Sequence, residues 1–279
     1  MPIEPTVITS LQNERVKLIR SLEMRKARKE TGLFVAEGTS VLVSAREQGV
    51  VPDMLVALAG AGLDNPIHRG LLQWGLKHDT QVLEVSAAVM GKIAAKDNPQ
   101  TMMGVFRQRW AEPPSIAALA PADCWLALED VRDPGNLGTI IRTLDAVGAR
   151  GVILVGACCD PTSRECVRAT MGSLFAVPIV RMEHAAFRDW IKGWPGDVVG
   201  THLEAKQDFR TASLREPALL VMGREGPGLS AELTAACTRL VVIPMAGRLD
   251  SLNLAVATAL TLYQIRGRHL RMQVQRGVP

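Results

Sequence analysis

The sequence predicts an α/β protein built on a parallel sheet and preceded by a smaller α/β domain. From Cys124 onward, short apolar runs alternate with stretches of helical pattern. The apolar runs contain no regular polar positions, which is typical of strands buried on both faces of a parallel sheet. A segment rich in Pro and Ala and poor in charge, residues 111–122, separates this region from the first 110 residues. We therefore predict domains at 1–110 and 123–279, joined by a linker at 111–122.

The second domain is expected to alternate strands with helices. Six strands are predicted at Cys124–Leu128, Gly151–Val155, Ala176–Val180, Asp197–Thr201, Ala218–Met222 and Leu240–Ile243. Five helices are predicted at Leu137–Val147, Ser163–Leu174, Ala185–Ile191, Ser230–Ala236 and Leu252–Arg266. The last strand should end at Pro244, because proline has no N–H for a ladder.

The first domain is also expected to alternate strands with helices, over shorter distances. Strands are predicted at 32–38, Asp53–Leu58, Gln81–Val85 and Thr101–Arg107, and helices at Thr39–Gln48, Leu71–His78 and Ser86–Ala95. Ser86 is a plausible N-cap of the last of these helices.

The composition excludes several classes of protein. The net charge is +4, which is compatible with a nucleic-acid partner but does not require one. No apolar run approaches the roughly 20 residues of a membrane span, so no membrane association is expected. The N-terminus lacks the basic and apolar segments of a secretory signal. The five cysteines form no C-x-x-C pair, which disfavours both a disulfide framework and a zinc site and favours a reducing cytoplasm. We expect no metal.

A basic amphipathic segment opens the chain. Val16, Leu18, Ile19 and Leu22 recur at roughly helical spacing. The basic residues of the segment are Arg15, Lys17, Arg20, Arg25, Lys26, Arg28 and Lys29. Two interpretations remain open: a solvated helix face, or a surface that contacts nucleic-acid phosphates. Residues 1–110 hold 14 Lys and Arg against 11 Asp and Glu, a net charge of +3, so this smaller N-terminal part carries most of the chain's net charge of +4.

Three polar loops follow predicted strands of the second domain, where α/β proteins place ligands. The first, at 129–143, contains Asp133-Pro-Gly-Asn-Leu-Gly-Thr-Ile-Ile-Arg-Thr. The second is Val221-Met-Gly-Arg-Glu-Gly-Pro-Gly-Leu, and the third is Ile243-Pro-Met followed by Ser251-Leu-Asn-Leu-Ala-Val-Ala. Each alone has a structural interpretation: a turn with an N-cap, a glycine-rich turn, and a helix cap at Ser251.

Other common catalytic motifs are missing from the sequence. There is no G-x-x-x-x-G-K-[ST] loop, no G-x-G-x-x-G after the first strand of either domain, and no G-x-S-x-G elbow. P-loop hydrolases, dinucleotide-binding enzymes and α/β-hydrolases are therefore unsupported.

Taken together and in order, the three loops closely resemble those of the SpoU (TrmH-type) RNA ribose methyltransferases of the SPOUT superfamily. The resemblance covers residues from about 123 to 268. It implies a sheet with a C-terminal trefoil knot, a homodimer, and S-adenosylmethionine as cofactor. The first domain resembles the ribosomal-protein-like substrate RNA-binding domain that some members carry.

The resemblance also implies roles for individual residues. The cofactor would be held around Gly223, Ile243 and Leu252, with Met222, Met245 and Thr201 as neighbours. The catalytic and ribose-binding face would comprise Asn136, Arg142, Glu225, Ser251 and Asn253. The implied activity is 2′-O-methylation of an RNA ribose, with the basic accessory domain favouring ribosomal RNA. A tRNA methyltransferase of the same fold and a non-catalytic RNA-binding protein are the alternatives.

Overall fold

The computed structural model describes residues 7–94 and 100–271, which form two compact units. The first unit comprises Met1–Arg109, Leu137–Arg142 and Asp160–Ala176, and the second comprises Trp110–Asn136, Thr143–Cys159 and Val177–Pro279. The chain therefore returns to the first unit twice after leaving it. The predicted domain boundary at 111–122 stays a prediction.

The first unit is built on a four-stranded mixed sheet in the order β1-β4-β2-β3. Its strands are β1 (Leu33–Glu37), β2 (Met54–Leu58), β3 (Gln81–Val85) and β4 (Met102–Arg107). β4 is antiparallel to both β1 and β2, whereas β2 and β3 are parallel. All four predicted strands of this domain are confirmed.

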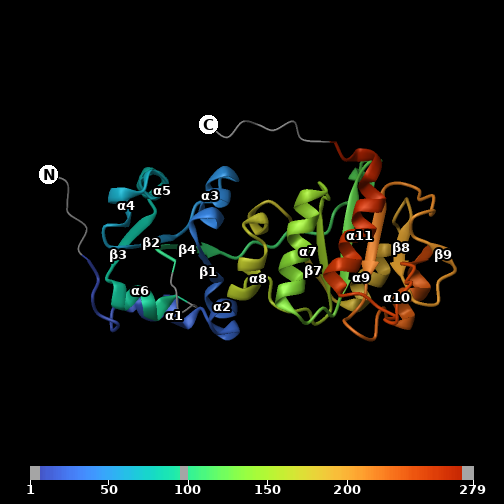
Figure 1. Ribbon diagram of the computed structural model, residues 1–279, viewed down its shortest axis with the longest axis horizontal. Helices are drawn as coiled ribbons and strands as arrows, with labels where there is room; N and C mark the ends of the chain where they lie inside the picture. The colour runs from blue at the N-terminus through green and yellow to red at the C-terminus, as the bar shows by residue number, and fades with distance from the viewer. Residues whose placement is uncertain (1–6, 95–99, 272–279) are drawn as a thin grey trace. The chain divides into compact units, whose positions relative to one another are not determined.

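Helices cover both faces of this sheet (Figure 1). They are α1 (Glu14–Ser21), α2 (Arg25–Thr31), α3 (Thr39–Glu47), α4 (Ala61–Asp64), α5 (Pro66–Lys77), α6 (Ala87–Ile93) and α8 (Arg164–Ala169). Buried side chains of α1 and α6 form the core on one face. Those of α3, α5 and α8 form the core on the other face, where Val167 of α8 packs with Leu42 and Phe106.

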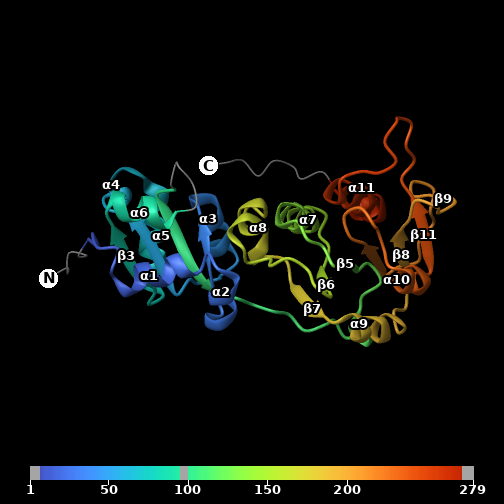
Figure 2. The same cartoon turned by 90° about the horizontal axis from the view of Figure 1, so that it is seen from below.

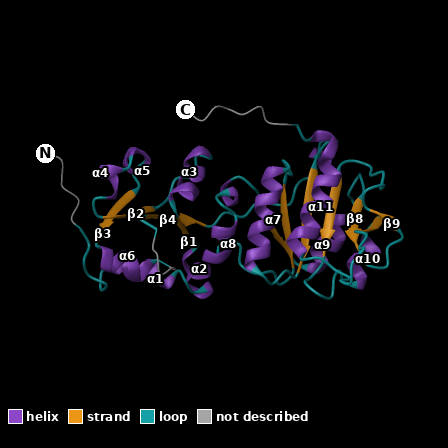
Figure 3. Cartoon of the chain, viewed as in Figure 1, coloured by secondary structure: helices purple, strands orange, loops and turns teal. Residues whose placement is uncertain are grey.

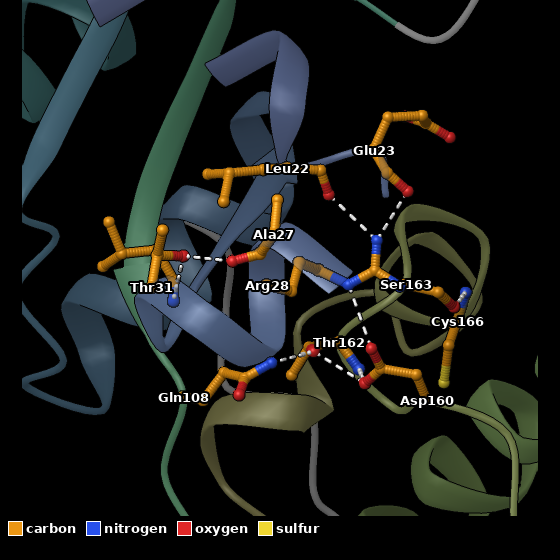
Figure 4. A network of polar contacts seen from close by, with 11 residues as sticks. Leu22, Glu23, Ala27, Arg28, Thr31, Gln108, Asp160, Thr162, Ser163 and Cys166 are labelled. Atoms are coloured by element: carbon orange, nitrogen blue, oxygen red, sulfur yellow. Dashed lines mark hydrogen bonds and ion pairs between the residues drawn. The ribbon is translucent and has the colours of Figure 1, made fainter. Parts of the chain in front are cut away.

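A buried polar network joins residues 160–164 to the rest of the first unit (Figure 4). The Arg28 guanidinium donates to the Asp160 carboxylate (2.9 Å) and to the Leu22 and Glu23 carbonyls. The Asp160 carboxylate also accepts from the Thr162 hydroxyl (2.7 Å). Arg164 pairs with Glu37 in the same unit. Two arginines are thus buried, and each has a carboxylate partner.

The second unit is built on a seven-stranded sheet in the order β7-β6-β5-β10-β8-β11-β9. Its strands are β5 (Cys124–Glu129), β6 (Gly151–Val155), β7 (Ile179–Met182), β8 (Val198–Thr201), β9 (Gln207–Asp208), β10 (Ala218–Met222) and β11 (Arg239–Val242). Every neighbouring pair is parallel, which confirms the predicted sheet. Figure 3 shows these strands in orange between helices.

The helices of the second unit lie on opposite faces of the sheet (Figure 2). They are α9 (His184–Ile191), α10 (Ala231–Ala236) and α11 (Leu254–Arg266). The helix α7 (Pro134–Ala146) contributes its two ends to this unit, whereas its middle, Leu137–Arg142, belongs to the first unit. α9 and α10 cover one face, where Phe187, Ile191 and Leu233 pack on Trp125 and Val221. α11 lies on the other face, and Thr258 and Leu262 are among its buried residues.

Several element boundaries differ from those predicted. The basic N-terminal segment forms two helices, α1 and α2, because the chain leaves the first helix at Leu22 and is extended at Met24. The strand predicted at Ala176–Val180 begins only at Ile179, since a short 3₁₀ helix, η2 (Ser173–Phe175), and Pro178 precede it. α4 and β9 were not predicted, and both are short.

Some helix starts follow the capping rules closely. The Ser86 hydroxyl accepts from the Val89 N–H, as expected. α5 starts earlier than predicted, at Pro66, because Asn65 accepts from the N–H groups of Ile67 and His68 and proline suits the first helical turn. Two further short 3₁₀ helices are η1 (Ile116–Ala118) and η3 (Gly267–His269). In residues 7–94 and 100–271, no helix combines the length and apolarity that a membrane crossing requires.

Candidate active site

The three polar loops all follow the carboxyl ends of strands in the second unit. One follows β5, one follows β10, and the longest runs from Ile243, after β11, to Asn253. The strands are parallel, so their carboxyl ends share one edge of the sheet. The sheet therefore gathers segments that lie more than a hundred residues apart in the chain.

A relay of side-chain hydrogen bonds connects these loops. The Asn136 amide nitrogen donates to Glu225 Oε1 (3.2 Å). The Asn253 amide nitrogen donates to Asn136 Oδ1 (2.9 Å). One residue from each loop therefore takes part, and the relay holds all three loops in a fixed arrangement.

The relay fixes the orientation of both amides. An ionised carboxylate only accepts hydrogen bonds, so Asn136 must direct its NH₂ group to Glu225 and its oxygen to Asn253. Asn253 then directs its own oxygen to the N–H groups of Ala255 (2.9 Å) and Val256 (3.4 Å). Asn253 is thus the N-cap of α11.

This finding corrects the interpretation of Ser251 as the helix cap. Ser251 is exposed, and its hydroxyl donates to the Asp250 carboxylate (3.3 Å). The helix begins at Leu254, two residues later than predicted, because an Asn side chain reaches the first-turn N–H groups from position 253. The catalytic role predicted for Ser251 stays a prediction.

Glu225 binds the main chain of the first loop. Its carboxylate accepts from the N–H groups of Arg132 (3.2 Å) and Asp133 (3.3 Å) as well as from Asn136. Partial burial alone would raise the pKa of Glu225, but these hydrogen bonds outweigh it and lower that pKa below its ordinary value. The geometry is that of an ionised residue that positions a loop.

The predicted cofactor residues lie at the same edge, on β8, β10 and the segment after β11. The Thr201 hydroxyl donates to the sulfur of Met222 (3.4 Å), which places the ends of β8 and β10 side by side. Val241 pairs in register with Thr201, so Ile243 follows the adjacent strand end. Met245 and Leu252, farther along, are both partly exposed apolar side chains.

Gly223 has a structural reason to be glycine. A Cβ at this position would collide with the main chain of Gly228 and Leu229, so the turn after β10 closes only without a side chain. Gly226 and Gly228 have φ angles of 87° and 75°, in the left-handed region that favours glycine. The cofactor role of Gly223 therefore stays a prediction.

Arg142 lies on α7, in the part of that helix that belongs to the first unit. Its side chain is exposed. Among the described residues, the Arg142 guanidinium makes no hydrogen bond or ion pair. It is available to a ligand.

The predicted RNA-binding residues divide into two groups. Six of them are exposed on α1 and α2: Arg15, Lys17, Arg20, Arg25, Lys26 and Lys29. Arg28 is the exception, and its burial argues against the predicted contact with RNA. Its side chain is only 5% exposed and is occupied by Asp160 and two carbonyls, so it cannot reach a phosphate in this structure (Figure 4).

Two features near the site were not predicted from the sequence. Arg132 is exposed in the first loop, beside the N–H that Glu225 binds. Asp130 forms a pair with His184. The sequence offered a signal for Arg132, which stands inside the first motif, but none for a contact between residues 54 positions apart. Among the residues that the structure describes, no group of His, Cys, Asp and Glu could hold a metal ion.

Comparisons with known proteins agree with the geometry of the second unit. The model of the SpoU rRNA Methylase family matches residues 123–263. The model of the MRM3-like substrate binding domain matches residues 13–104.

Individual relatives are similar over nearly the whole chain. The chain is 30% identical over 261 residues to a 23S rRNA guanosine 2′-O-methyltransferase of Bacillus subtilis (strain 168), RlmP, covering 93% of this chain and 99% of the relative. It resembles the crystal structure of an AdoMet-bound rRNA methyltransferase from Sinorhizobium meliloti, with 42% identity, a TM-score of 0.85 and coverage of 95% and 99% of the two chains. It also resembles the SpoU methyltransferase AviRb from Streptomyces viridochromogenes in complex with AdoMet, with 28% identity, a TM-score of 0.81 and coverage of 92% and 98%.

Proposed function

The chain belongs to the SpoU rRNA methylase family, and we propose that it transfers a methyl group from S-adenosylmethionine to the 2′-hydroxyl of a ribose in ribosomal RNA. The observation that carries this proposal is the relay Glu225–Asn136–Asn253, which joins all three family motifs at one edge of the sheet. The relatives named as rRNA methyltransferases support ribosomal RNA as the substrate.

The donor would bind along the carboxyl ends of β8, β10 and β11. S-adenosylmethionine supplies an electrophilic methyl group on a sulfonium. The residues present fit such a ligand, because Met245 and Leu252 offer partly exposed apolar surface beside loops whose main chain can hydrogen-bond an adenine. Gly223, Ile243, Met222 and Thr201 complete the proposed binding site, and Met222 and Thr201 are already in contact.

The protein's own contribution to the chemistry is mainly positioning. Holding two reactants in line can lower a barrier by about 7–11 kcal/mol. Asn136 and Asn253, fixed by Glu225, would orient the ribose, and Ser251 would add a hydrogen bond from the third loop. A guanidinium keeps its proton at neutral pH, so we assign Arg142 as a bidentate clamp on the neighbouring phosphate that also stabilises charge developing on the 2′-oxygen.

The exposed basic residues of α1 and α2 would bind RNA outside the reacting nucleotide. Arg15, Arg20, Arg25 and Lys29 make no hydrogen bond through their side chains among the described residues. Lys17 and Lys26 have exposed partners, Glu14 (2.8 Å) and Glu30 (3.9 Å), and such pairs exchange readily for a phosphate. The match of residues 13–104 to a substrate-binding domain supports this assignment.

We further propose that the chain acts as a homodimer with a knotted C-terminal segment, in the cytoplasm. Val256, Leu260 and Tyr263 form an exposed apolar stripe along α11 that a second copy could cover. The sheet order β10-β8-β11, in which both outer strands follow the central one in the chain, is compatible with such threading. Sedimentation of the wild type and of the Leu260→Asp variant tests the dimer. A monomeric wild type would overturn it, and a variant that sediments like a dimeric wild type would place the interface elsewhere.

The activity is tested with labelled S-adenosylmethionine and total RNA from a strain lacking the enzyme, followed by mapping of the labelled ribose. Label on a 2′-oxygen of ribosomal RNA is expected, whereas label on tRNA would support the tRNA alternative. No label together with no donor binding by calorimetry would support a non-catalytic RNA-binding protein.

Arg142 variants then test its role. Arg142→Lys should lose much of the activity but keep some, because a single ammonium still attracts the phosphate. If Arg142→Ala methylates as fast as the wild type, the clamp is ruled out.

A further inference from the structure

A second polar cluster lies at the carboxyl ends of β5, β6 and β7, on the other half of the same sheet edge. It consists of Glu129 and Asp130 at the end of β5, Gly156 after β6, and His184 at the start of α9. His184 Nε2 is 3.3 Å from Asp130 Oδ1, and His184 Nδ1 is 3.7 Å from Glu129 Oε1. Glu129 and Asp130 begin the first polar loop, but the proposed reaction gives no role to this cluster.

The direction of the hydrogen bond is determined by the carboxylate. The Ala157 N–H (2.7 Å) and His184 both hydrogen-bond Asp130 Oδ1. Burial would raise the pKa of Asp130, but these contacts and the nearby charge of Arg132 lower it, so the carboxylate is ionised and only accepts. The proton of the pair therefore lies on His184 Nε2, and the imidazole donates.

Two backbone features indicate that this contact is built in. Asp130 has a φ angle of 49°, in the left-handed region that non-glycine residues rarely adopt. Such strained positions persist only where surrounding contacts hold them, and they cluster at functional sites. At Gly156 a Cβ would collide with both the imidazole of His184 and the carboxylate of Asp130. The pair exists only because position 156 has no side chain.

The Asp130–His184 pair lies at one end of the loop that carries Asn136. Moving along this loop, the Asp130 N–H donates to the Val155 carbonyl (3.0 Å), and the Val131 carbonyl accepts from the Cys159 N–H (2.7 Å). Farther along the loop, the N–H groups of Arg132 and Asp133 donate to the Glu225 carboxylate. The loop is therefore fixed from two sides: by Glu225 after β10, and by His184 with the 156–159 segment after β6.

We propose that His184 is a positioning residue, which holds the strained Asp130 and thereby sets the loop that presents Asn136 to the ribose. This inference rests on the proposed function for its effect on activity, but not for its effect on the loop. The side chain is 40% exposed, so a direct contact of the imidazole with RNA is the competing interpretation.

Three measurements on the intact chain test the proposal. Hydrogen exchange of the 130–136 loop should become faster in His184→Ala, while exchange in α10 and α11 stays unchanged. Single-turnover methylation of ribosomal RNA at saturating RNA and donor should fall about tenfold to hundredfold, because misplacement of a reacting group by about 1 Å has effects of that size. Affinities for RNA and donor should be unchanged.

Three further variants separate positioning from a general structural role. His184→Gln keeps an amide donor and should recover much of the rate. Asp130→Gly relieves the backbone strain, so it should keep the melting temperature while the loop exchanges faster and the rate falls. Arg188→Gln changes an exposed charge on the same helix and should match the wild type.

Three outcomes would overturn the proposal. Weaker RNA binding by His184→Ala with unchanged loop exchange would make the imidazole an RNA contact. A lower melting temperature with faster exchange throughout the second unit would make it merely structural, and no change at all would leave it without a role. If the wild type methylates no RNA, the proposed function fails, while the exchange measurements still decide whether His184 holds the loop.

Discussion

The two units each contain a polar network, but the two networks differ in burial and in charge. In the first unit, Arg28 with Asp160 and Arg164 with Glu37 are ion pairs whose side chains are at most 7% exposed. In the second unit, the relay contains one ionised residue, Glu225, and two amides, and Asn253 is exposed. The first network is enclosed by protein, whereas the second faces solvent where a ligand can reach it.

The difference teaches what each network can do. Buried charges must be fully paired, since an unpaired ion inside a protein is very unfavourable. Arg28 is therefore held inside the protein by Asp160 and two carbonyls, although in the sequence it resembles its exposed neighbours. The amides of the relay are neutral, so they can stay at a surface and still keep a fixed orientation. Networks of the first kind maintain the fold, and we expect those of the second kind to serve the reaction.

The largest expected effect is on stability, from Asp160→Ala in the first unit. Removing the carboxylate leaves Arg28 buried without its partner, which should lower the free energy of unfolding by about 3–5 kcal/mol. Urea denaturation measures it. Glu30→Ala is the matched control: Glu30 pairs with Lys26 on the surface, and its loss should cost less than about 0.5 kcal/mol. Equal losses in the two variants would contradict the contrast between the networks.

The next effect is on activity, from Glu225→Ala in the second unit. Losing the acceptor frees the N–H groups of Arg132 and Asp133 and the amide of Asn136, so single-turnover methylation should fall about 100-fold. Glu225→Gln keeps one accepting oxygen and should lie between this variant and the wild type. If the rate falls only as far as the loss of folded protein explains, Glu225 maintains the fold, as Asp160 does, and does not serve the reaction.

Acid should remove the contribution of Glu225 to stability. The hydrogen bonds that lower its pKa below the ordinary 4.5 favour the ionised form in the folded state. Its stabilising contribution is therefore complete above that ordinary value and is lost as the pH falls through the lower, folded-state pKa. Unfolding of the wild type and of Glu225→Gln, followed from neutral pH into acid, should converge only below pH 4.5. Convergence near neutral pH would contradict the sign of the shift.

Two variants of Asn253 distinguish its role as the N-cap of α11 from its role in the relay. Asn253→Ala removes both, and removal of the cap should cost about 1 kcal/mol. Asn253→Asp keeps an oxygen for the N–H groups of α11 but cannot donate to Asn136, so stability should be kept while methylation falls. Thermal denaturation and methylation rate are compared in the two variants. Full activity in Asn253→Asp would show that the relay is unnecessary.

The smallest effect on stability should come from the exposed basic residues. Changing Arg25, Lys26 and Lys29 to Gln should alter unfolding by less than about 0.5 kcal/mol. RNA binding should weaken, and the slope of log affinity against log salt should flatten by about 0.7–0.9 for each phosphate that the variant no longer binds. The control changes Arg46, Lys77 and Lys92, also exposed in the first unit, to Gln. Identical salt slopes in the two triple variants would leave α1 and α2 as solvated surfaces.

The sequence predicted those parts of the molecule that depend on local patterns. β3 and β10 have the predicted bounds, and Ser86 caps its helix, because apolar runs and capping side chains act within a few residues. The three motif loops were also placed correctly, at the ends of strands whose parallel order brings them to one edge. The parallel fold and the family followed from these local signals.

Only the tertiary structure decided which polar residues are enclosed and which are available. Arg28 lies inside a basic helix, but a carboxylate 132 positions later buries it. Ser251 and Asn253 are both good caps, and the geometry of the chain entering α11 selected Asn253. The partner of Asp130 came from α9, through a gap left by Gly156. In each case the deciding contact joins segments that are distant in the chain, and the free energy of such contacts depends on burial that local sequence does not encode.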